Sequence, residues 1–375
     1  MMEPGPVKEL SYKDLELCTD NFSKENYIGD FQFGKIYRGK VLQGKCAEPL
    51  PVTVKIWEVS ELYKQYPGDN ELRMLDELVL LRHEKLTRHP VMVRLFGYCY
   101  EDEHFGVVYD LKSLNTVYNL VPKVSVSRFI VISLDNMANK MVGSEPHKLD
   151  NFDWLQRIKV IVGLAHLLKI FHARNPSYEP FLIRNIAASH IILDEDYNPK
   201  LCDFSMISGG IFPNRAANRF QYVFGCYGSI ESSFHYYGKW STKSDIFAFG
   251  VLLLNLITKR VDRQEERGSD RPFVYEWAQK VYDDDTGKLS RRSLVHGSLE
   301  ADPLYIKTDG AKITKLAIQC VEDDPKDRPT IKQVVRSLMK LQIVYRDASI
   351  HDMDQIFRGH DAPKKSPKVG SFIMH

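Results

Sequence analysis

The chain has 375 residues, of which 43% are apolar and 27% charged, the composition of an ordinary globular protein with one or two domains. Its 51 basic and 49 acidic residues leave a net charge of +2. This balance does not indicate a protein surface that binds nucleic acid or a membrane. The six cysteines are scattered without short-spaced pairs, so we predict no zinc knuckle or disulfide framework.

Targeting signals are the next feature to test. The N-terminal stretch "MMEPGPVKELSYKDLE" has no apolar core of the kind a signal peptide needs. No apolar run reaches the roughly 18 residues of a membrane-spanning helix. We therefore expect a soluble cytoplasmic protein without membrane insertion. Recruitment to the inner face of the plasma membrane stays open as an option.

Strand patterns come first along the chain and helical patterns follow. Short apolar runs between turn residues predict strands from residue 21 to about 110, interrupted by one helical segment, "DNELRMLDELVLLRHEKL". After residue 151 the periodicity is helical, for example in "FDWLQRIKVIVGLAHLLKIFHA" and "KSDIFAFGVLLLNLITK". This order predicts two segregated lobes.

The expected organisation has four parts. Residues 1–20 form an N-terminal lead-in, 21–112 the first lobe, 113–345 the second lobe and 346–375 a polar, proline-containing tail that we expect to be disordered. Residues 124–149 lack clear periodicity, and we predict no packed element there. They are interpreted either as a surface insertion or as an artefact of gene modelling.

The first functional motif is the turn in "IGDFQFGKIYRG". It resembles the glycine-rich loop of protein kinases, G-x-G-x-x-G-x-V, with Gly29 and Gly34 at the first and third glycine positions. Glycine allows the backbone to lie against nucleotide phosphates. The middle glycine is replaced by Phe31, whose side chain should hinder that approach.

A lysine motif follows at the expected distance. "VTVK", ending at Lys55, resembles the V-A-I-K strand, whose lysine holds the α- and β-phosphates in kinases. The resemblance implies a partner glutamate on the next helix. We predict Glu77, with Glu71 as the alternative.

The stretch 181–205 resembles the kinase catalytic loop and metal motif. "IRNIAASH" stands where the family has H-R-D-L-x-x-x-N, and "DFS" stands where it has D-F-G. The resemblance therefore places Asn185 at the catalytic base, Ala187 at the catalytic-loop lysine and His190 at the metal-binding asparagine. Asp203 keeps the place of the metal-binding aspartate.

Later motifs narrow the resemblance. "GCYGSIESSF", "STKSDIFAFGVLLLNLITKR" and "DPKDRPT" are similar to successive segments of plant receptor-like kinases and receptor-like cytoplasmic kinases. Apart from the insertion, the resemblance runs from about Ser11 to Arg346. It implies the α+β, bilobal protein kinase fold. The N-lobe is expected to be small and β-rich with one main helix, and the C-lobe larger and mainly helical.

This sequence differs from the kinase family pattern at the residues that perform catalysis in that family. The Asn185 amide has no useful basicity, and a general base is typically worth about 10²–10⁴-fold in rate. Ala187 removes a positive charge facing the transferred phosphoryl group. The imidazole of His190 is a poor ligand for Mg²⁺, which prefers oxygen. Catalysis by the usual route is therefore not expected.

Two arginines are expected to lose the roles they have in active kinases. The family's glutamate partner of Arg328 is replaced by Ser233, so we expect Arg328 either to find another partner or to face water. Arg184, which in active kinases holds a phosphate on the activation segment, has few candidate acceptors there.

These observations predict a catalytically impaired pseudokinase that acts as a protein-binding adaptor or decoy in plant receptor or immune-type signalling. By analogy with the family, its partners are an active receptor kinase or an intracellular immune receptor. The alternatives are a low-activity ATP-dependent serine/threonine kinase and a nucleotide-responsive switch without phosphoryl transfer.

The retained residues leave nucleotide binding open. Lys55, Glu77 and Asp203 either bind a nucleotide as a regulatory ligand or form a buried ion pair between the lobes. Phe31 and His190 favour weak or absent ATP binding and make Mg²⁺ binding doubtful.

Overall fold

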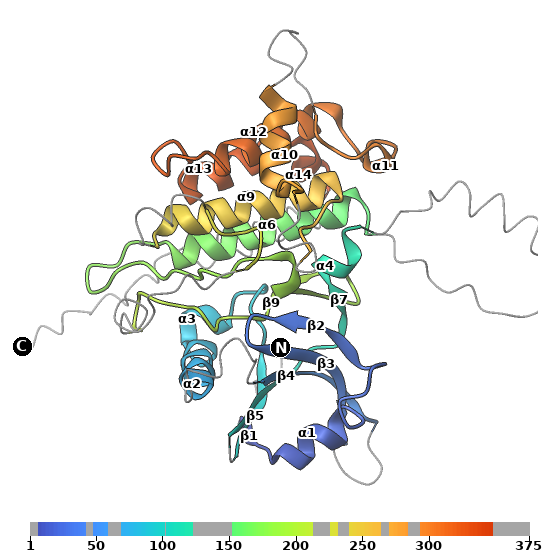
Figure 1. Cartoon of the computed structure of the whole chain (residues 1–375), viewed down its shortest axis with the longest axis vertical. Helices are drawn as coiled ribbons and strands as arrows, with labels where there is room; N and C mark the ends of the chain where they lie inside the picture. The colour runs from blue at the N-terminus through green and yellow to red at the C-terminus, as the bar shows by residue number, and fades with distance from the viewer. Residues whose placement is uncertain are drawn as a thin grey trace, which may run out of the picture.

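The strands of the N-terminal part form one six-stranded sheet with the order β1-β5-β6-β4-β3-β2 (Figure 1). The computed structural model describes residues 7–42, 48–58, 69–101, 103–122, 152–212, 226–231, 240–263, 270–283 and 293–347. The strands of this sheet are β1 (Lys8–Glu9), β2 (Tyr27–Phe31), β3 (Gly34–Val41), β4 (Leu50–Trp57), β5 (Leu95–Glu101) and β6 (His104–Tyr109). Strand β1 pairs parallel with β5, and the other neighbours are antiparallel.

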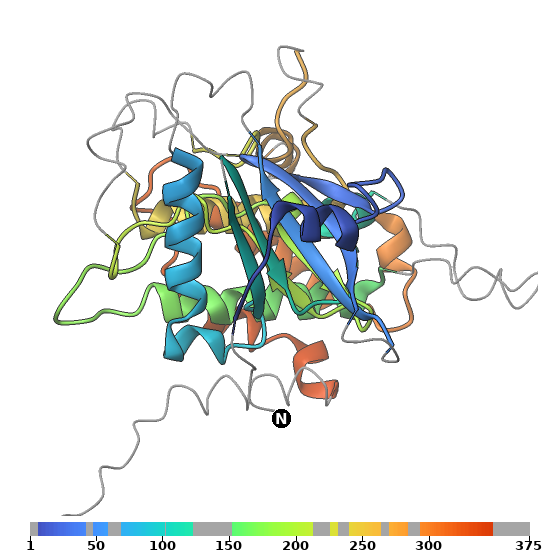
Figure 2. The same ribbon diagram turned by 90° about the horizontal axis from the view of Figure 1, so that it is seen from below.

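The sheet buries apolar side chains on both faces. Successive strand residues point to opposite faces, so Val107 and Val108 of β6 belong to two different buried clusters. Val107 shares its cluster with Met74 of α2 (Asp69–Leu81), whereas Val108 shares the other with Leu15 of α1 (Tyr12–Cys18). Figure 2 shows α1 lying across the sheet and α2 beside it. The short helix α3 (Glu84–Thr87) follows α2.

Of the expected N-terminal lead-in over residues 1–20, residues 7–20 pack onto this lobe through β1 and α1, and residues 1–6 lie outside the described residues. A capping box between Ser11 and Asp14 begins α1, and Leu15 is fully buried against the sheet. Both elements are short, two residues for β1 and seven for α1. Segments of this length show no clear periodicity in the sequence, and it is the packing of Leu15 that fixes them.

A second, three-stranded sheet begins the C-lobe. It has the order β7-β8-β9 and consists of β7 (Ser113–Thr116), β8 (Ile191–Asp194) and β9 (Pro199–Leu201). The short helix α4 (Val117–Leu120) follows β7, and the 3₁₀ turn η1 (Ala188–His190) leads directly into β8. This small sheet therefore carries the segment that resembles the catalytic loop.

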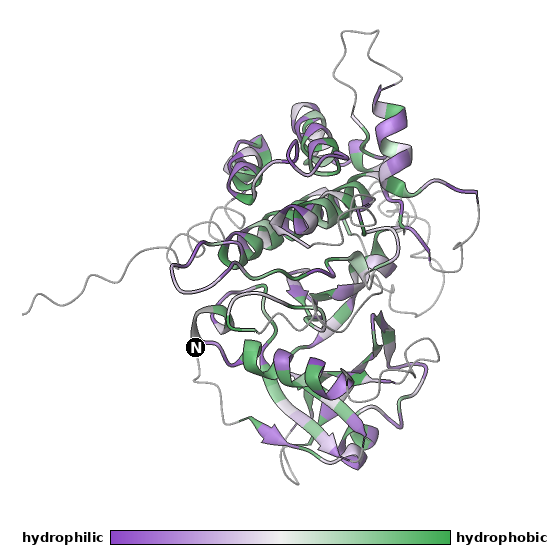
Figure 3. Cartoon of the chain, turned by 60° about the vertical axis from the view of Figure 1, so that its left-hand side comes forward, coloured by the Kyte–Doolittle hydropathy of each residue, from purple (hydrophilic) through white to green (hydrophobic). Residues whose placement is uncertain are grey.

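Helices make up the rest of the C-lobe. They are α6 (Trp154–Phe171), α9 (Thr242–Thr258), α10 (Val274–Asp283), α11 (Gly297–Glu300), α12 (Lys307–Cys320), α13 (Ile331–Leu338) and α14 (Gln342–Arg346). Helix α6 begins at a capping box between Asp153 and Gln156, and α9 at one between Ser241 and Ser244. Hydrophobic residues are concentrated on the central helices of this lobe (Figure 3), as expected for helices buried on most sides.

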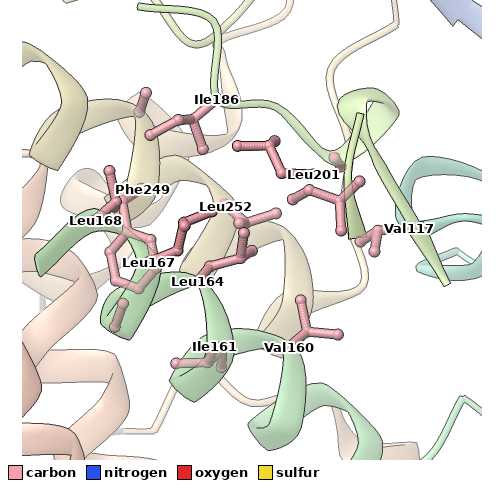
Figure 4. Packing of buried hydrophobic residues seen from close by; sticks show 14 of the residues in the cluster. Val117, Val160, Ile161, Leu164, Leu167, Leu168, Ile186, Leu201, Phe249 and Leu252 are labelled. Atoms are coloured by element: carbon pink, nitrogen blue, oxygen red, sulfur yellow. The ribbon is translucent and has the colours of Figure 1, made fainter. Parts of the chain in front are cut away.

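The catalytic-loop segment rests on the core of the C-lobe. Leu164 and Leu167 of α6 and Leu252 of α9 pack together near Ile186 of the loop and Leu201 of β9 (Figure 4). All five side chains are buried. The loop therefore has a rigid base, because a densely packed interior resists local displacement.

The two-lobed α+β architecture predicted from the sequence is confirmed. The expected insertion at 124–149 lies outside the described residues, as does the expected tail beyond residue 347. Within the described part of the chain, no helix combines the length and the apolarity needed to cross a bilayer.

Candidate nucleotide cleft and catalytic loop

Lys55 of β4 lies at the centre of a buried polar cluster between the lobes. Its Nζ donates to Glu77 Oε2 at 2.6 Å, to Asp203 Oδ1 at 3.0 Å and to the Cys202 carbonyl at 3.2 Å. Lys55, Glu77 and Asp203 all have 0% exposure. A lysine ammonium has three N–H donors, so these three acceptors use all of them.

The structure pairs Lys55 with Glu77 and not with Glu71, whose carboxylate accepts from the Tyr100 hydroxyl at the surface. The other carboxylate oxygen of Glu77 accepts from the Tyr109 hydroxyl, which also lies 3.0 Å from the Cys202 carbonyl. Burial would lower the pKa of Lys55, but the carboxylates of Asp203 and Glu77 outweigh it and raise that pKa. The ammonium therefore stays charged.

The Phe31 ring covers this ammonium. The ring centroid lies 4.2 Å from Lys55 Nζ, and the Trp57 ring lies at 4.5 Å, so two aromatic faces contact the cation. Phe31 and Trp57 pack edge to face with their centroids 5.6 Å apart. Phe31 is only 5% exposed, because it packs against Lys55 and Trp57.

The two retained glycines of the loop differ in what they require. A Cβ on Gly34 would lie 1.9 Å from the Ile56 carbonyl oxygen and 2.9 Å from the Phe31 ring, so only glycine fits there. A Cβ on Gly29 would meet nothing closer than a Thr116 methyl group at 3.4 Å. The packing of this hairpin therefore requires glycine at position 34 whether or not a phosphate binds. The packing does not require glycine at position 29.

Asp245, in the first turn of α9, holds the start of the catalytic loop. Its carboxylate accepts from the backbone N–H of Ile183 at 3.0 Å and of Arg184 at 2.8 Å, and it contacts His172 Nε2 at 3.0 Å. Arg184 has a positive φ of 67°, a conformation that side-chain-bearing residues seldom adopt. These bonds to Asp245 stabilise that strained turn.

Asn185 points at the metal-motif aspartate. Its Nδ2 donates to Asp203 Oδ2 at 2.6 Å, while Ser205 donates to Asp203 Oδ1 through its N–H at 3.0 Å and its hydroxyl at 2.6 Å. Burial alone would raise the pKa of Asp203, but Lys55, His190 and the Ser205 hydroxyl, in that order, lower it to about 2. Asp203 is thus an ionised carboxylate with both oxygens hydrogen-bonded by the protein.

His190 faces the same carboxylate as a neutral ring. Its Nδ1 lies 2.7 Å from the Asn185 carbonyl, which can only accept, so Nδ1 carries the proton. The same nitrogen is 3.3 Å from Asp203 Oδ2, and the Cys226 thiol lies within 3.7 Å of Nε2. Burial lowers the pKa of His190, with Asp203 opposing the shift. Ala187, directly before the 3₁₀ turn, places a methyl group where the family has a cation.

These residues do not fit the magnesium sites that the resemblance implied. Mg²⁺ prefers several oxygen ligands, and the side chains around the Asp203 carboxylate are an ammonium, an amide, a hydroxyl and an imidazole. Among the described residues, no group of three or more His, Cys, Asp or Glu side chains is placed to hold a metal ion.

Arg328 has found another carboxylate partner in place of the family's glutamate at position 233. Glu231, two residues before Ser233, accepts from Arg328 Nη1, and both side chains are buried. The guanidinium also donates to the carbonyls of Glu322 and Asp323. The family pattern has its glutamate at position 233, whereas the fold brings Glu231 to the arginine.

Arg184 stacks on an aromatic ring. Its guanidinium carbon lies 5.0 Å from the Trp240 ring centroid. Burial lowers its pKa to about 10, with Asp245 opposing. Residues 213–225, which include most of the expected activation segment, lie outside the described part of the chain.

Sequence reasoning missed three side chains of this cluster. Trp57 and Tyr109 carry no motif signal, because their roles depend on packing across the cleft. Ser205 was noted only as a missing glycine, although a serine two residues after an aspartate often bonds to it locally. This sequence pattern could have predicted the hydrogen bond between Ser205 and Asp203.

A β-rich lobe carrying a lysine–glutamate pair, set against a helical lobe carrying an aspartate, defines a protein kinase fold. The family model described as protein tyrosine and serine/threonine kinase matches residues 22–338. The chain belongs to this family.

Its relatives are plant kinases. It is 28% identical over 345 residues to serine/threonine-protein kinase BIK1 of Arabidopsis thaliana, covering 91% of this chain and 78% of that protein. It is 30% identical over 336 residues to the EPD1-interacting receptor-like cytoplasmic serine/threonine-protein kinase of Nicotiana benthamiana, covering 88% of this chain and 63% of that protein. Identity to serine/threonine-protein kinase CDG1 of Arabidopsis thaliana is 29% over 332 residues, 88% of this chain and 67% of that one. The resemblance to receptor-like cytoplasmic kinases is confirmed.

Proposed function

We propose that this chain is a catalytically impaired member of the kinase family, a pseudokinase, that acts as a protein-binding adaptor or decoy in plant receptor or immune-type signalling. The observation that carries the proposal is that protein groups already occupy the hydrogen-bonding positions of Lys55 and Asp203. Lys55 donates all its N–H groups to protein acceptors, and the Asp203 carboxylate accepts from Lys55, Asn185 and Ser205. Kinases of this family normally use these positions to bind ATP and Mg²⁺.

Three further features support impaired catalysis. Asn185 cannot accept a proton from a substrate hydroxyl, and its amide is already bonded to Asp203. Phe31 occupies the face of Lys55 that phosphates would approach. Ala187 supplies no cation to stabilise the transferred group.

A phosphate-incorporation assay with Mg-ATP and a generic protein substrate tests the catalytic half of the proposal. The full chain is compared with Lys55→Ala, and with Lys35→Ala as a control on the exposed Lys35–Glu58 pair. We expect no incorporation that depends on Lys55. Incorporation lost only in Lys55→Ala would establish the alternative, a low-activity ATP-dependent kinase.

The intact Lys55–Glu77 pair, at 2.6 Å, favours a nucleotide-responsive switch as the second candidate. A thermal titration of the unmodified chain with ATP, with and without Mg²⁺, needs no variant that could fail to fold. We expect no saturable shift in either case, whereas a saturable shift with ATP alone would support the switch.

Partner binding tests the adaptor half. By analogy with its relatives, the expected partner is an active receptor kinase or an intracellular immune receptor at the membrane's inner face. The tagged chain is co-expressed with such candidates in plant cells and precipitated in EDTA or in Mg-ATP. An adaptor should bind equally in both buffers, and binding that requires Mg-ATP would contradict this proposal.

A further inference from the structure

A cavity whose described wall carries several cations lies in the C-lobe, apart from the buried cluster around Lys55. It has a volume of about 470 Å³ and is lined by residues that follow α9 and by residues at the start of α10. The charged side chains of its described wall are four cations and one carboxylate: Lys259, Arg260, Arg263, Arg271 and Asp262. An excess of positive charge in a concave site attracts anions.

The single carboxylate is turned toward the backbone. Asp262 Oδ1 accepts from the N–H of Val274 at 3.0 Å. Its other oxygen lies against Gly228, where an added Cβ would be 2.5 Å away. The Asp262 carboxylate therefore helps to fix the shape of the cavity through its contacts with the backbone.

Lys259 is buried, and no acidic side chain pairs with it among the described residues. It is only 8% exposed, and in the described part of the chain its Nζ has one hydrogen-bond partner, the Ser298 hydroxyl at 3.5 Å. Burial lowers the pKa of Lys259 to about 8, and the neighbouring Arg157 cation adds to the shift. A buried cation of this kind gains more from an anionic ligand than an exposed lysine does.

The segment that carries these cations is preorganised by contacts within the protein. The Arg260 guanidinium lies 4.1 Å above the Trp277 ring, which holds its plane and leaves its edge free to donate. The backbone of Arg260 is fixed at both ends, its carbonyl by Asn255 Nδ2 and its N–H by the Thr258 hydroxyl. Little ordering is therefore required on binding, which favours affinity.

We propose that this cavity binds a small phosphate anion of at least two negative charges, a diphosphate or a group of clustered phosphomonoesters, through Lys259, Arg260 and Arg263. Guanidinium and phosphate match in charge and in bidentate geometry. The ligand is either a soluble metabolite or a lipid headgroup. The site is independent of the catalytic state of the cleft.

Calorimetric titration of the full chain with inorganic pyrophosphate tests the site. We expect saturable binding that Arg260→Gln weakens about tenfold or more, as the loss of a charge-assisted hydrogen bond predicts. Lys259→Gln should weaken it comparably. The matched control is Arg336→Gln, which removes an exposed arginine on α13 and should leave the affinity unchanged. No saturable binding, or equal affinity in Arg260→Gln, would overturn the proposal.

Sedimentation with phosphatidylcholine vesicles, with and without phosphatidylinositol bisphosphate, distinguishes the two sources. Vesicle binding that pyrophosphate competes away and that Arg260→Gln abolishes assigns a lipid headgroup. Pyrophosphate binding without vesicle binding assigns a soluble ligand. Vesicle binding that pyrophosphate does not displace would contradict the cavity as the site.

Discussion

The amide of Asn185 donates to Asp203 Oδ2 at 2.6 Å, whereas Asn185 Oδ1 has no hydrogen-bond partner among the described residues. The residue is 1% exposed, so a change to a charged group here takes place away from water. An aspartate at position 185, the family's catalytic base, would place a second buried carboxylate against the first. Restoring the catalytic aspartate at position 185 would therefore lower the stability of the fold.

For Asn185→Asp we expect a loss of about 3–5 kcal/mol in the free energy of unfolding at pH 7, the usual cost of an uncompensated buried charge. Burial and repulsion raise the pKa of the new carboxyl above its unfolded value, so its protonation at lower pH should reduce the loss. Urea unfolding at pH 7 and pH 5 measures both effects.

The matched control is Asn198→Asp. Asn198 also donates through Nδ2 to an aspartate, Asp194 Oδ2 at 3.0 Å, but it is only partly buried. Its cost should stay below about 1 kcal/mol, as for exposed charge pairs. Equal costs at the two positions would contradict the buried cluster.

His190 gives a dependence of stability on pH. Because burial lowers its pKa below the ordinary 6.5, the unfolded chain binds the proton more readily than the folded one. Stability should therefore fall as the pH drops below about 6.5, and His190→Gln should reduce that fall. His104→Gln, at an exposed histidine, is the control, and identical pH profiles for wild type and His190→Gln would refute this prediction.

At the scale of elements, the segment before α9 is tied to the region before α13 by one buried ion pair, Glu231–Arg328. The two residues are 97 positions apart, so no local pattern links them. Segment 226–231 thus keeps its attachment to the helical lobe although the family's glutamate at position 233 is absent.

Glu231→Gln should lower the free energy of unfolding by about 3–5 kcal/mol, because it leaves the buried Arg328 without its countercharge. The control is Glu300→Gln, at an exposed carboxylate on α11 that accepts from the Tyr305 hydroxyl. Chemical denaturation of both variants measures the difference. If Glu231→Gln were as mild as the control, the ion pair would not hold the segment.

At the scale of the whole molecule, Arg157 of α6 joins the two ends of the expected insertion. Its guanidinium donates to the Val121 carbonyl at 3.2 Å, to the Phe152 carbonyl at 2.9 Å and to the Leu256 carbonyl of α9 at 2.7 Å. One buried side chain thus holds the residues on both sides of 124–149 against the central helices. Arg157 therefore ties the chain on both sides of this segment to the core of the C-lobe.

Deletion of residues 124–149 should leave the fold intact. Four residues would then join Val121 to Phe152, enough to span roughly 13 Å, and a shorter loop costs less closure entropy. We expect the melting temperature to change by no more than about 3 °C. Arg157→Met should instead destabilise strongly, because it leaves three buried carbonyls unpaired. Loss of cooperative unfolding in the deletion variant would show that the segment belongs to the core.

The sequence by itself determined the order of strands before helices, the two lobes and the positions of Lys55 and Asp203, because periodicity and motif spacing are properties of neighbouring residues. Only the tertiary structure decided how those positions are used. Lys55 and Asp203 are 148 residues apart. Their bond, the Phe31 ring above it and the pairing of Arg328 with Glu231 all depend on which distant side chains the packed lobes bring together. The packing of Leu15 against the sheet belongs to the same group, since burial in a shared core is set by the whole chain.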